Sequence, residues 1–439
     1  MRIRSRWLAA ILLLAAIPAL ASASTRAFVG ATIIPVDGDP IANGTLVVSD
    51  GRVEAVGARD AVRIPDGAEV VELSAGTVIM PGIVDTHSHV GDVSGADRSG
   101  PIQPDARAMD SINVLSSGIK RALAGGITSV NVMPGSGHLI SGQTVYLKLR
   151  DGSAITDLAY RFDDGGLMGG MKMANGTNSI GSAPFPGTRA KSAALVRAAY
   201  LEAQAYAEKL EQAEDGEPPP RDLGKEALAE VLSGKRMVHF HSHRHDDLMT
   251  AIRLRDEFGF RMVLHHTSEA WRVADELAAA EVPVSLILID SPGGKLEAKN
   301  LQAKSAPALE RAGVPTALHS DDWVTDSRYF LRMAGMAIRA GMSRRAAIES
   351  MTIRGAEMLD IADRVGTLTP GKDADFVILS GDPFSVYTRV LETWVEGNRR
   401  FDFDDEDDRL VAEGGFNALS DDDGNGHIHG HAHGHGGDQ

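Results

Sequence analysis

The sequence predicts an α/β fold: a (β/α)8 barrel, or TIM barrel, with a small β-sandwich domain built from both chain ends. First, apolar strand-like runs alternate with amphipathic helical runs from residue 83 to about residue 360. Second, short β-like runs separated by turn dipeptides precede and follow that region. Third, histidine clusters follow several of the strand-like runs. Regular alternation of strands and helices indicates parallel strands, and it favours a closed barrel over an open sheet.

The first residues are typical of a cleaved export signal. Three arginines within residues 1–6 precede an apolar stretch at 8–20, and small residues follow at 21–23. This arrangement predicts a signal peptide at residues 1–23 and an exported protein, either periplasmic or secreted. The apolar stretch is short for a membrane-spanning helix, so we expect no stable membrane anchor after cleavage.

Composition restricts the function further. The formal net charge is −16 and no basic stripe offsets it, which argues against a nucleic-acid partner. The sequence contains no cysteine, so the chain forms no disulfide and must bind any metal ion through nitrogen or oxygen donors. With 439 residues, the chain is long enough for more than one domain.

The domain boundaries follow changes in the sequence pattern. The barrel is expected at residues 82–361, and residues 24–81 with 362–403 are expected to form the composite β-sandwich domain. Residues 404–439 are acidic and then rich in glycine and histidine, a composition that predicts a disordered tail. Metal binding and a purely solubilising role are equally compatible with this tail.

One long helix interrupts the regular alternation. Residues 190–213 are rich in alanine, with glutamate and lysine on the polar face, and the run EDGEPPP ends the helix. Such a helix near the barrel mouth would either shape a substrate pocket or elaborate the surface. The sequence favours neither reading.

Residues 76–92 contain the pattern around which the chain is organised. Two apolar residues lead into the run DTHSH, which contains His87 and His89. Because side chains alternate along a strand, both histidines point to the same face and can bind one metal ion. An H-x-H pattern alone is weak evidence, but further histidine clusters follow downstream.

Polar clusters follow four further strand-like runs. They contain Lys172 on the expected fourth strand, His239, His241 and His243 on the fifth, His265 and His266 on the sixth, and His319, Asp321 and Asp322 on the eighth. Barrel active sites lie at the carboxyl ends of the strands, so these side chains are expected to converge with His87 and His89.

These residues, in this order, resemble the binuclear metal sites of the amidohydrolase superfamily, and in particular its imidazolonepropionase-like branch with the metal-dependent Xaa-Pro dipeptidases. The resemblance extends from about residue 27 to residue 400. It rests on the stretches PGIVDTHSH, KMANGTN, HFHSHRHDD, LHHTSEA, LHSDD and RVGTLTPGKDADFVIL. It implies a hydrolase that cleaves a C–N bond, in an amide or a cyclic amide, through a metal-activated hydroxide.

The resemblance also implies the cofactor and its ligands. Two divalent ions are expected, with zinc ahead of iron, manganese and nickel. Lys172 matches a position that is carboxylated in many members, where the carbamate bridges both ions; the alternative for Lys172 is a substrate-carboxylate binder or a surface position. Asp321 is implied as the general base that returns its proton to the leaving nitrogen. The implied ligands are His87, His89, Lys172, His241, His266 and Asp321.

Neighbouring residues leave alternatives on the fifth and sixth strands. His239 and His243 share the expected face of His241, so the ligand could lie one pleat away. His266 is preferred over His265, which is expected to face the opposite way and to pack against other residues.

On the eighth strand, Asp321 is preferred over Asp322 because it lies two residues after His319, on the same inward face. His319 would then orient a ligand or a substrate. Arg189 suits a substrate carboxylate, although a surface salt bridge at a helix start is the slightly favoured explanation. The candidates for substrate binding are Arg189, Tyr146 on the expected third strand, His319 and Trp323.

Two other functions remain open at this point. The same site would suit a lactonase or a phosphotriesterase-like hydrolase, because a fold does not determine a substrate. The histidine-rich tail alone suggests a non-catalytic, exported metal-binding protein. The expected partner is a small-molecule or dipeptide-like substrate, and the chain is a possible homo-oligomer.

Overall fold

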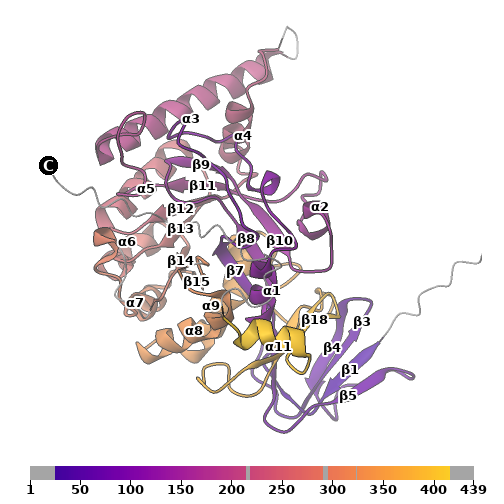
Figure 1. The fold of residues 1–439 in the computed structure, drawn as a ribbon. Coiled ribbons are helices and arrows are strands. Elements are labelled where there is room, and N and C mark those ends of the chain that lie inside the picture. The colour runs from indigo at the N-terminus through magenta and orange to yellow at the C-terminus, as the bar shows by residue number, and fades with distance from the viewer. Residues whose placement is uncertain (1–24, 214–217, 290–294, 323, 416–439) are drawn as a thin grey trace, which may run out of the picture.

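The computed structural model describes residues 25–213, 218–289, 295–322 and 324–415. The protein is a mixed α/β structure in which two small sheets lie beside a larger body of strands and helices (Figure 1). The predictions for residues 1–23, for the tail from residue 416 onward and for Trp323 lie outside the described residues. Within the described part, no helix combines the length and apolar character needed to span a membrane.

Parallel strands form the centre of the body. β7 (Ile83–Ser88) and β8 (Ile127–Val132) pair in parallel. A second parallel series follows the chain order: β11 (Met171–Ala174), β12 (Val238–Ser242), β13 (Met262–His266), β14 (Val284–Leu286) and β15 (Thr316–Leu318). The end of β15 meets β7, because the backbone N–H of Asp321 donates to the carbonyl of His87 at 2.9 Å.

The expected third strand differs from the prediction. β10 (Val145–Lys148), which carries Tyr146, runs antiparallel to β8. β9 (Ile140–Gln143) runs antiparallel to β11. Only residues 133–139 separate β8 from β9, which is too short for the crossover helix that a parallel return needs. The regular alternation therefore fails at this point.

Helices cover the outer side of the central strands. α5 (His245–Phe258) buries Leu248 and Ile252, and it ends at Gly259, whose φ of 74° suits glycine. Outward strand residues such as Phe240 and Leu264 belong to the same buried cluster. The other helices of the body are α1 (Ser117–Ala124), α2 (Ile155–Leu158), α4 (Leu223–Leu232), α6 (Ala274–Ala279), α7 (Ser305–Ala312), α8 (Phe330–Arg339), α9 (Arg344–Met351) and α10 (Ile353–Met358).

The long helix expected at residues 190–213 is present as α3 (Arg189–Gln212). The side chain of Thr188 begins it by accepting a hydrogen bond from the backbone N–H of Lys191 at 3.2 Å. α3 packs against α4 and α5 at the outer edge of the body (Figure 1). Short 3₁₀ turns among the described residues join other elements: η1 (Ala108–Asp110), η3 (Ala270–Arg272), η4 (Leu296–Ala298) and η5 (Ser327–Tyr329).

The two chain ends meet in the small sheets. One has the order β4-β3-β1-β5 and the other β18-β17-β16-β6-β2. Phe28 of the first sheet contacts the rings of Phe376 and Trp394 of the second, each at a centroid distance of 5.1 Å. The strands are β1 (Arg26–Val29), β2 (Thr32–Ile33), β3 (Gly44–Ser49), β4 (Arg52–Ala58), β5 (Glu69–Glu72), β6 (Val78–Pro81), β16 (Phe376–Leu379), β17 (Val390–Val395) and β18 (Asn398–Asp402).

The prediction of a disordered tail from residue 404 was wrong for its first part. Residues 406–413 form α11 (Glu406–Glu413), which packs against α1 and β18. The Asp405 side chain accepts hydrogen bonds from two backbone N–H groups, and the acidic first turn suits the positive end of the helix dipole. Val411 is buried, and Arg328 donates to its carbonyl at 3.0 Å. The acidic residues that indicated disorder therefore form the first turn of a helix.

Candidate metal centre

β7 brings the first two histidines to the site. His87 is the fifth residue of β7 and is fully buried, while His89 lies just beyond the strand and is partly exposed. The Nδ1 atom of His89 lies 2.7 Å from the carbonyl oxygen of Met133, which orients the ring. Nε2 of His89 therefore faces the interior, where a metal ligand would be needed.

Asp85 fixes the position of this strand end. Its carboxylate accepts hydrogen bonds from the backbone N–H of His87 at 3.2 Å and from that of Ser320 at 3.1 Å. It also accepts one from the Ser320 hydroxyl. Burial raises the pKa of Asp85 to about 7, although these hydrogen bonds oppose the shift. Sequence reasoning gave Asp85 no role, yet it joins β7 to the segment that carries Asp321.

Asp321 faces both histidines of β7. Its Oδ1 lies 3.0 Å from Nε2 of His89 and 3.4 Å from Nε2 of His87. Its backbone has a φ of 49°, a left-handed conformation that aspartate tolerates better than most residues. Burial alone would raise the pKa of Asp321. The contact with His89 and the charges of His319 and Lys172 outweigh burial, so the pKa lies below its usual value. The carboxylate is therefore ionised.

Lys172 points into the same group. Its Nζ lies 3.1 Å from Nε2 of His87 and 3.1 Å from the sulfur of Met133, and the residue is fully buried. Burial lowers the pKa of Lys172 to about 7, against the opposing charge of Asp321. A neutral amine is the form that can react with carbon dioxide to give a carbamate.

Two histidines of β12, His239 and His241, and His243 just after the strand line one face. The Nδ1 atom of His243 lies 2.7 Å from the Ser268 hydroxyl. His239 lies deeper in the strand, with Nε2 at 2.8 Å from the Tyr146 hydroxyl. His241 lies between them, and its ring centroid is 4.4 Å from that of His266. The structure therefore places Tyr146 in a fully buried hydrogen bond beneath this row.

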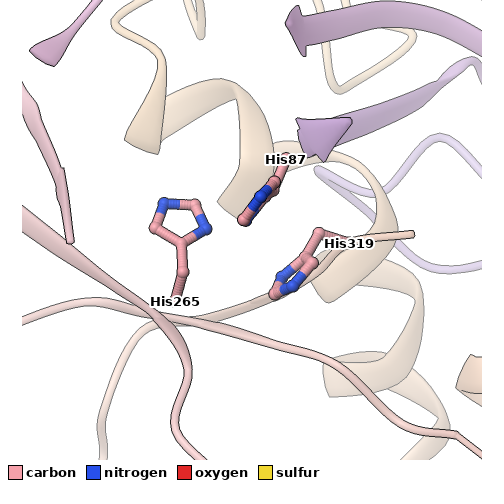
Figure 2. Close-up of side chains that lie close together, drawn as sticks. All are labelled: His87, His265 and His319. Atoms are coloured by element: carbon pink, nitrogen blue, oxygen red, sulfur yellow. The ribbon is translucent and has the colours of Figure 1, made fainter. Parts of the chain in front are cut away.

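The prediction that His265 faces away was wrong. Its ring centroid lies 5.0 Å from that of His87 and 5.4 Å from that of His319, and Figure 2 shows the three rings together. The φ of His266 is 68°, so the strand alternation breaks at that residue. Both His265 and His266 therefore lie among the interior histidines, since strict alternation would have turned one of them outward.

His319 connects these rings to β14. Its Nδ1 lies 2.7 Å from the Ser285 hydroxyl, and its Nε2 lies 3.1 Å from Nδ1 of His266. Both ring nitrogens of His319 are thus engaged within the protein. This arrangement suits the orientation of His266, which was one of the two roles expected for His319.

Arg189 lies in a different environment. Its Nε lies 2.9 Å and 3.0 Å from the two carboxylate oxygens of Asp247, at the first residue of α3. This contact is the helix-start salt bridge named as the alternative in the sequence. Trp323, the remaining substrate candidate, lies outside the described residues.

The cluster suits a divalent cation. Five buried histidine nitrogens have no hydrogen-bond partner among the described residues: Nδ1 of His87, His241 and His265, and Nε2 of His243 and His266. Burial is the main cause that lowers the pKa of the interior histidines. The pKa falls to about 3 for His239, His243 and His319. It falls well below the ordinary value for His87, His241, His265 and His266. Neutral imidazoles with free lone pairs are metal donors.

Sequence reasoning missed one carboxylate beside this cluster. Glu297 lies in η4, is 5% exposed, and has Oε1 at 3.9 Å from Nε2 of His241. No recognisable motif surrounds it in the sequence, because it lies in a connection between β14 and α7. Only the fold brings it to β12.

Known proteins share this arrangement of elements. The family model described as the Amidohydrolase family matches residues 78–407. A solved amidohydrolase from Thermotoga maritima MSB8 is 33% identical, with a TM-score of 0.77 and coverage of 86% of this chain and 99% of that one. A prolidase solved with N-methylphosphonate-L-proline is 17% identical, with a TM-score of 0.55 and the same coverage, which shows the fold alone.

A curated relative is much longer than this chain. Amidohydrolase tasK of Hapsidospora irregularis is 28% identical over 395 residues, which cover 82% of this chain and 40% of that protein. An enamidase of Eubacterium barkeri matches a shorter stretch, 34% identical over 94 residues, or 21% of this chain and 20% of that protein. The chain thus spans well under half the length of these curated relatives.

Proposed function

The chain belongs to the amidohydrolase family, and on that premise we propose that it is a metal-dependent hydrolase that cleaves the C–N bond of an amide or a cyclic amide. The observation that carries the proposal is the convergence of His87, His89 and Asp321 within 4.8 Å, with Lys172 beside them. These residues come from strand ends far apart in the sequence, and only the fold brings them together.

We propose two divalent cations, zinc in the first instance, as the resident group. His87, His89 and Asp321 would hold one ion, and His241 and His266 would hold the other. A carboxylated Lys172 would lie between them and supply two oxygen donors in place of a repelling ammonium group. When bound, such ions supply Lewis acidity, which activates water and polarises a carbonyl group.

Asp321 moves the proton in this proposal. Its ionised carboxylate accepts a proton from the attacking water as the new C–O bond forms. It then returns that proton to the nitrogen as the C–N bond breaks, because an unprotonated amide nitrogen is a poor leaving group. Nε2 of His89 and Oδ1 of Asp321 lie 3.0 Å apart, a separation that supports their binding to the same ion.

The fold and the surroundings of the site extend the proposal. We infer that the parallel strands close into a (β/α)8-type barrel, which the hydrogen bond between Asp321 and His87 supports, and that the two small sheets form a β-sandwich. We expect a small amide or a dipeptide such as Xaa-Pro as the substrate, and membership of the Amidohydrolase family supports cleavage of an amide bond. Export to the periplasm or the medium stays a prediction.

The test is metal content together with activity. The protein is the full chain in which the five tail histidines, at positions 427, 429, 431, 433 and 435, are replaced by serine. We call it the tail-substituted chain. We expect about two equivalents of zinc by elemental analysis and hydrolysis of at least one compound among Xaa-Pro dipeptides and cyclic amides. Lactones and phosphotriesters belong in the panel.

Lys172→Ala is the matched variant. It removes the proposed bridge, so we expect about one equivalent of zinc and a large loss of hydrolysis. A tail-substituted chain that binds no zinc, or that hydrolyses only lactones or phosphotriesters, contradicts the proposal.

A further inference from the structure

We propose that Glu297 is a metal ligand on the β12 side of the site, where it forms a three-donor group with His241 and His243. Donor atoms of these three buried residues lie within 4.8 Å of one another. The inference rests on the proposed function and adds a carboxylate that the family resemblance does not supply.

Only one of the two carboxylate oxygens of Glu297 accepts a hydrogen bond among the described residues. Oε2 accepts a hydrogen bond from the backbone N–H of Thr177 at 2.7 Å. Oε1 is buried and has no hydrogen-bond partner among the described residues, and it lies 3.9 Å from Nε2 of His241. A buried carboxylate oxygen without a partner lowers the stability of the fold. A cation bound to Oε1 would offset this loss.

The backbone is shaped to bring this carboxylate in. Gly176 has a φ of 79°, and a Cβ atom at this position would lie 2.5 Å from Oε2 of Glu297. Gly176 follows β11, the strand that carries Lys172. Glycine therefore allows the loop after β11 to close on Glu297 and to fix its direction.

His241 and His243 bring imidazole nitrogens to the same space, and that of His243 has no hydrogen-bond partner among the described residues. Nδ1 of His243 lies 2.7 Å from the Ser268 hydroxyl, which leaves Nε2 buried and without a partner. A histidine whose other ring nitrogen is held in this way is typical of metal ligands. Nε2 of His241 lies 3.3 Å from the side-chain amide nitrogen of Asn178 and 3.9 Å from Oε1 of Glu297.

Charge balance also favours a further carboxylate. Two divalent ions bring four positive charges into a buried site, and Asp321 with a carbamate on Lys172 supplies only two negative ones. Uncompensated charge is costly at low dielectric constant. The ion proposed to bind His241 and His266 has no contact with Asp321. Glu297 would reduce the excess positive charge at that ion.

The test measures zinc affinity in the tail-substituted chain carrying Glu297→Gln. Glutamine keeps an oxygen that can accept from Thr177 but removes the charge. We expect one of the two zinc ions to bind at least about tenfold more weakly, by competition with a chromophoric chelator. With cobalt instead of zinc, we expect a changed visible absorption spectrum. Glu276→Gln, at an exposed position of α6, is the control and should match the unsubstituted protein.

Melting temperatures separate a ligand from a structural residue. Without metal, Glu297→Gln should melt close to the temperature of the parent chain, because it removes both the cost of a buried charge and the attraction between Glu297 and Lys295. The rise in melting temperature on zinc addition should be smaller. His243→Gln should weaken the same zinc ion. Unchanged affinity for both ions, or a lower metal-free melting temperature with an unchanged zinc response, overturns the inference alone. Absence of zinc from the parent chain overturns the proposed function as well.

Discussion

Asp321 and Asp322 are adjacent in the sequence, but their surroundings shift their pKa values in opposite directions. Asp321 faces His87 and His89, and its pKa lies below the usual value. Burial raises the pKa of Asp322, whose Oδ2 accepts hydrogen bonds from the hydroxyl and the backbone N–H of Ser327. The sequence motif LHSDD contains both, and the structure directs only the first toward His87 and His89.

Replacing Asp321 should affect catalysis, whereas replacing Asp322 should affect stability. Asp321→Asn should lower kcat by about 10²–10⁴-fold, because it removes the proton acceptor, while at least one equivalent of metal is retained. Asp322→Asn should lower the melting temperature and leave kcat per folded molecule close to that of the parent. The measurements are steady-state kinetics, elemental analysis and calorimetry. Full activity in Asp321→Asn would remove it from the mechanism.

At the scale of elements, β12 and β13 concentrate buried imidazoles. β12 alternates His239 and His241 with Phe240, so one face carries polar rings and the other packs against helices. Period-two alternation made this division predictable from the sequence. At the end of β13 the alternation stops, because His266 adopts a positive φ, and no pattern in the residues announces it.

The buried histidines in and after the central strands predict a pH dependence for the metal-free protein. Burial lowers the folded-state pKa of His239, His243 and His319 to about 3, from about 6.5 when unfolded. The unfolded chain therefore binds more protons between these values, and stability should fall as the pH drops below about 6.5. Asp85, with a raised pKa of about 7, acts in the opposite direction but is a single group.

Denaturant titrations at pH 7.5 and pH 5 check this expectation. The free energy of unfolding of the metal-free chain should be lower at pH 5. His239→Gln removes one buried imidazole and should make the dependence shallower. An equal or higher stability at pH 5 would show that these histidines do not control it.

At the scale of the whole molecule, one buried ion cluster ties the body to the sheets built from both chain ends. Nζ of Lys148, in β10, donates to Asp373 and lies 3.2 Å from Asp375 and 3.4 Å from Glu396. Burial lowers the pKa of Lys148, but Asp375, Tyr160 and Asp373 outweigh burial and raise it. The ammonium group therefore stays charged between segments more than two hundred residues apart.

Breaking this cluster should destabilise the protein as a whole. Lys148→Met leaves the buried Asp375 without its ion-pair partner, although Arg364 still pairs with Asp373. We expect this to cost about 3–5 kcal/mol of unfolding free energy. Lys235→Met breaks a partly exposed pair with Asp164 and should cost about 1 kcal/mol or less. Denaturant unfolding measures both. Equal losses in the two variants would argue against a special role for the buried cluster.

The sequence by itself determined the order of strands and helices, the long helix at α3, and the residue types from which a metal site can be built. These features depend on local periodicity and on spacing along one strand, as for His87 and His89. The tertiary structure decided the antiparallel course of β9 and β10, the inward turn of His265, the helix at 406–413 and the approach of Glu297 to His241. Each of these depends on a backbone dihedral angle, a connection length or a contact across the fold, which side-chain periodicity does not encode.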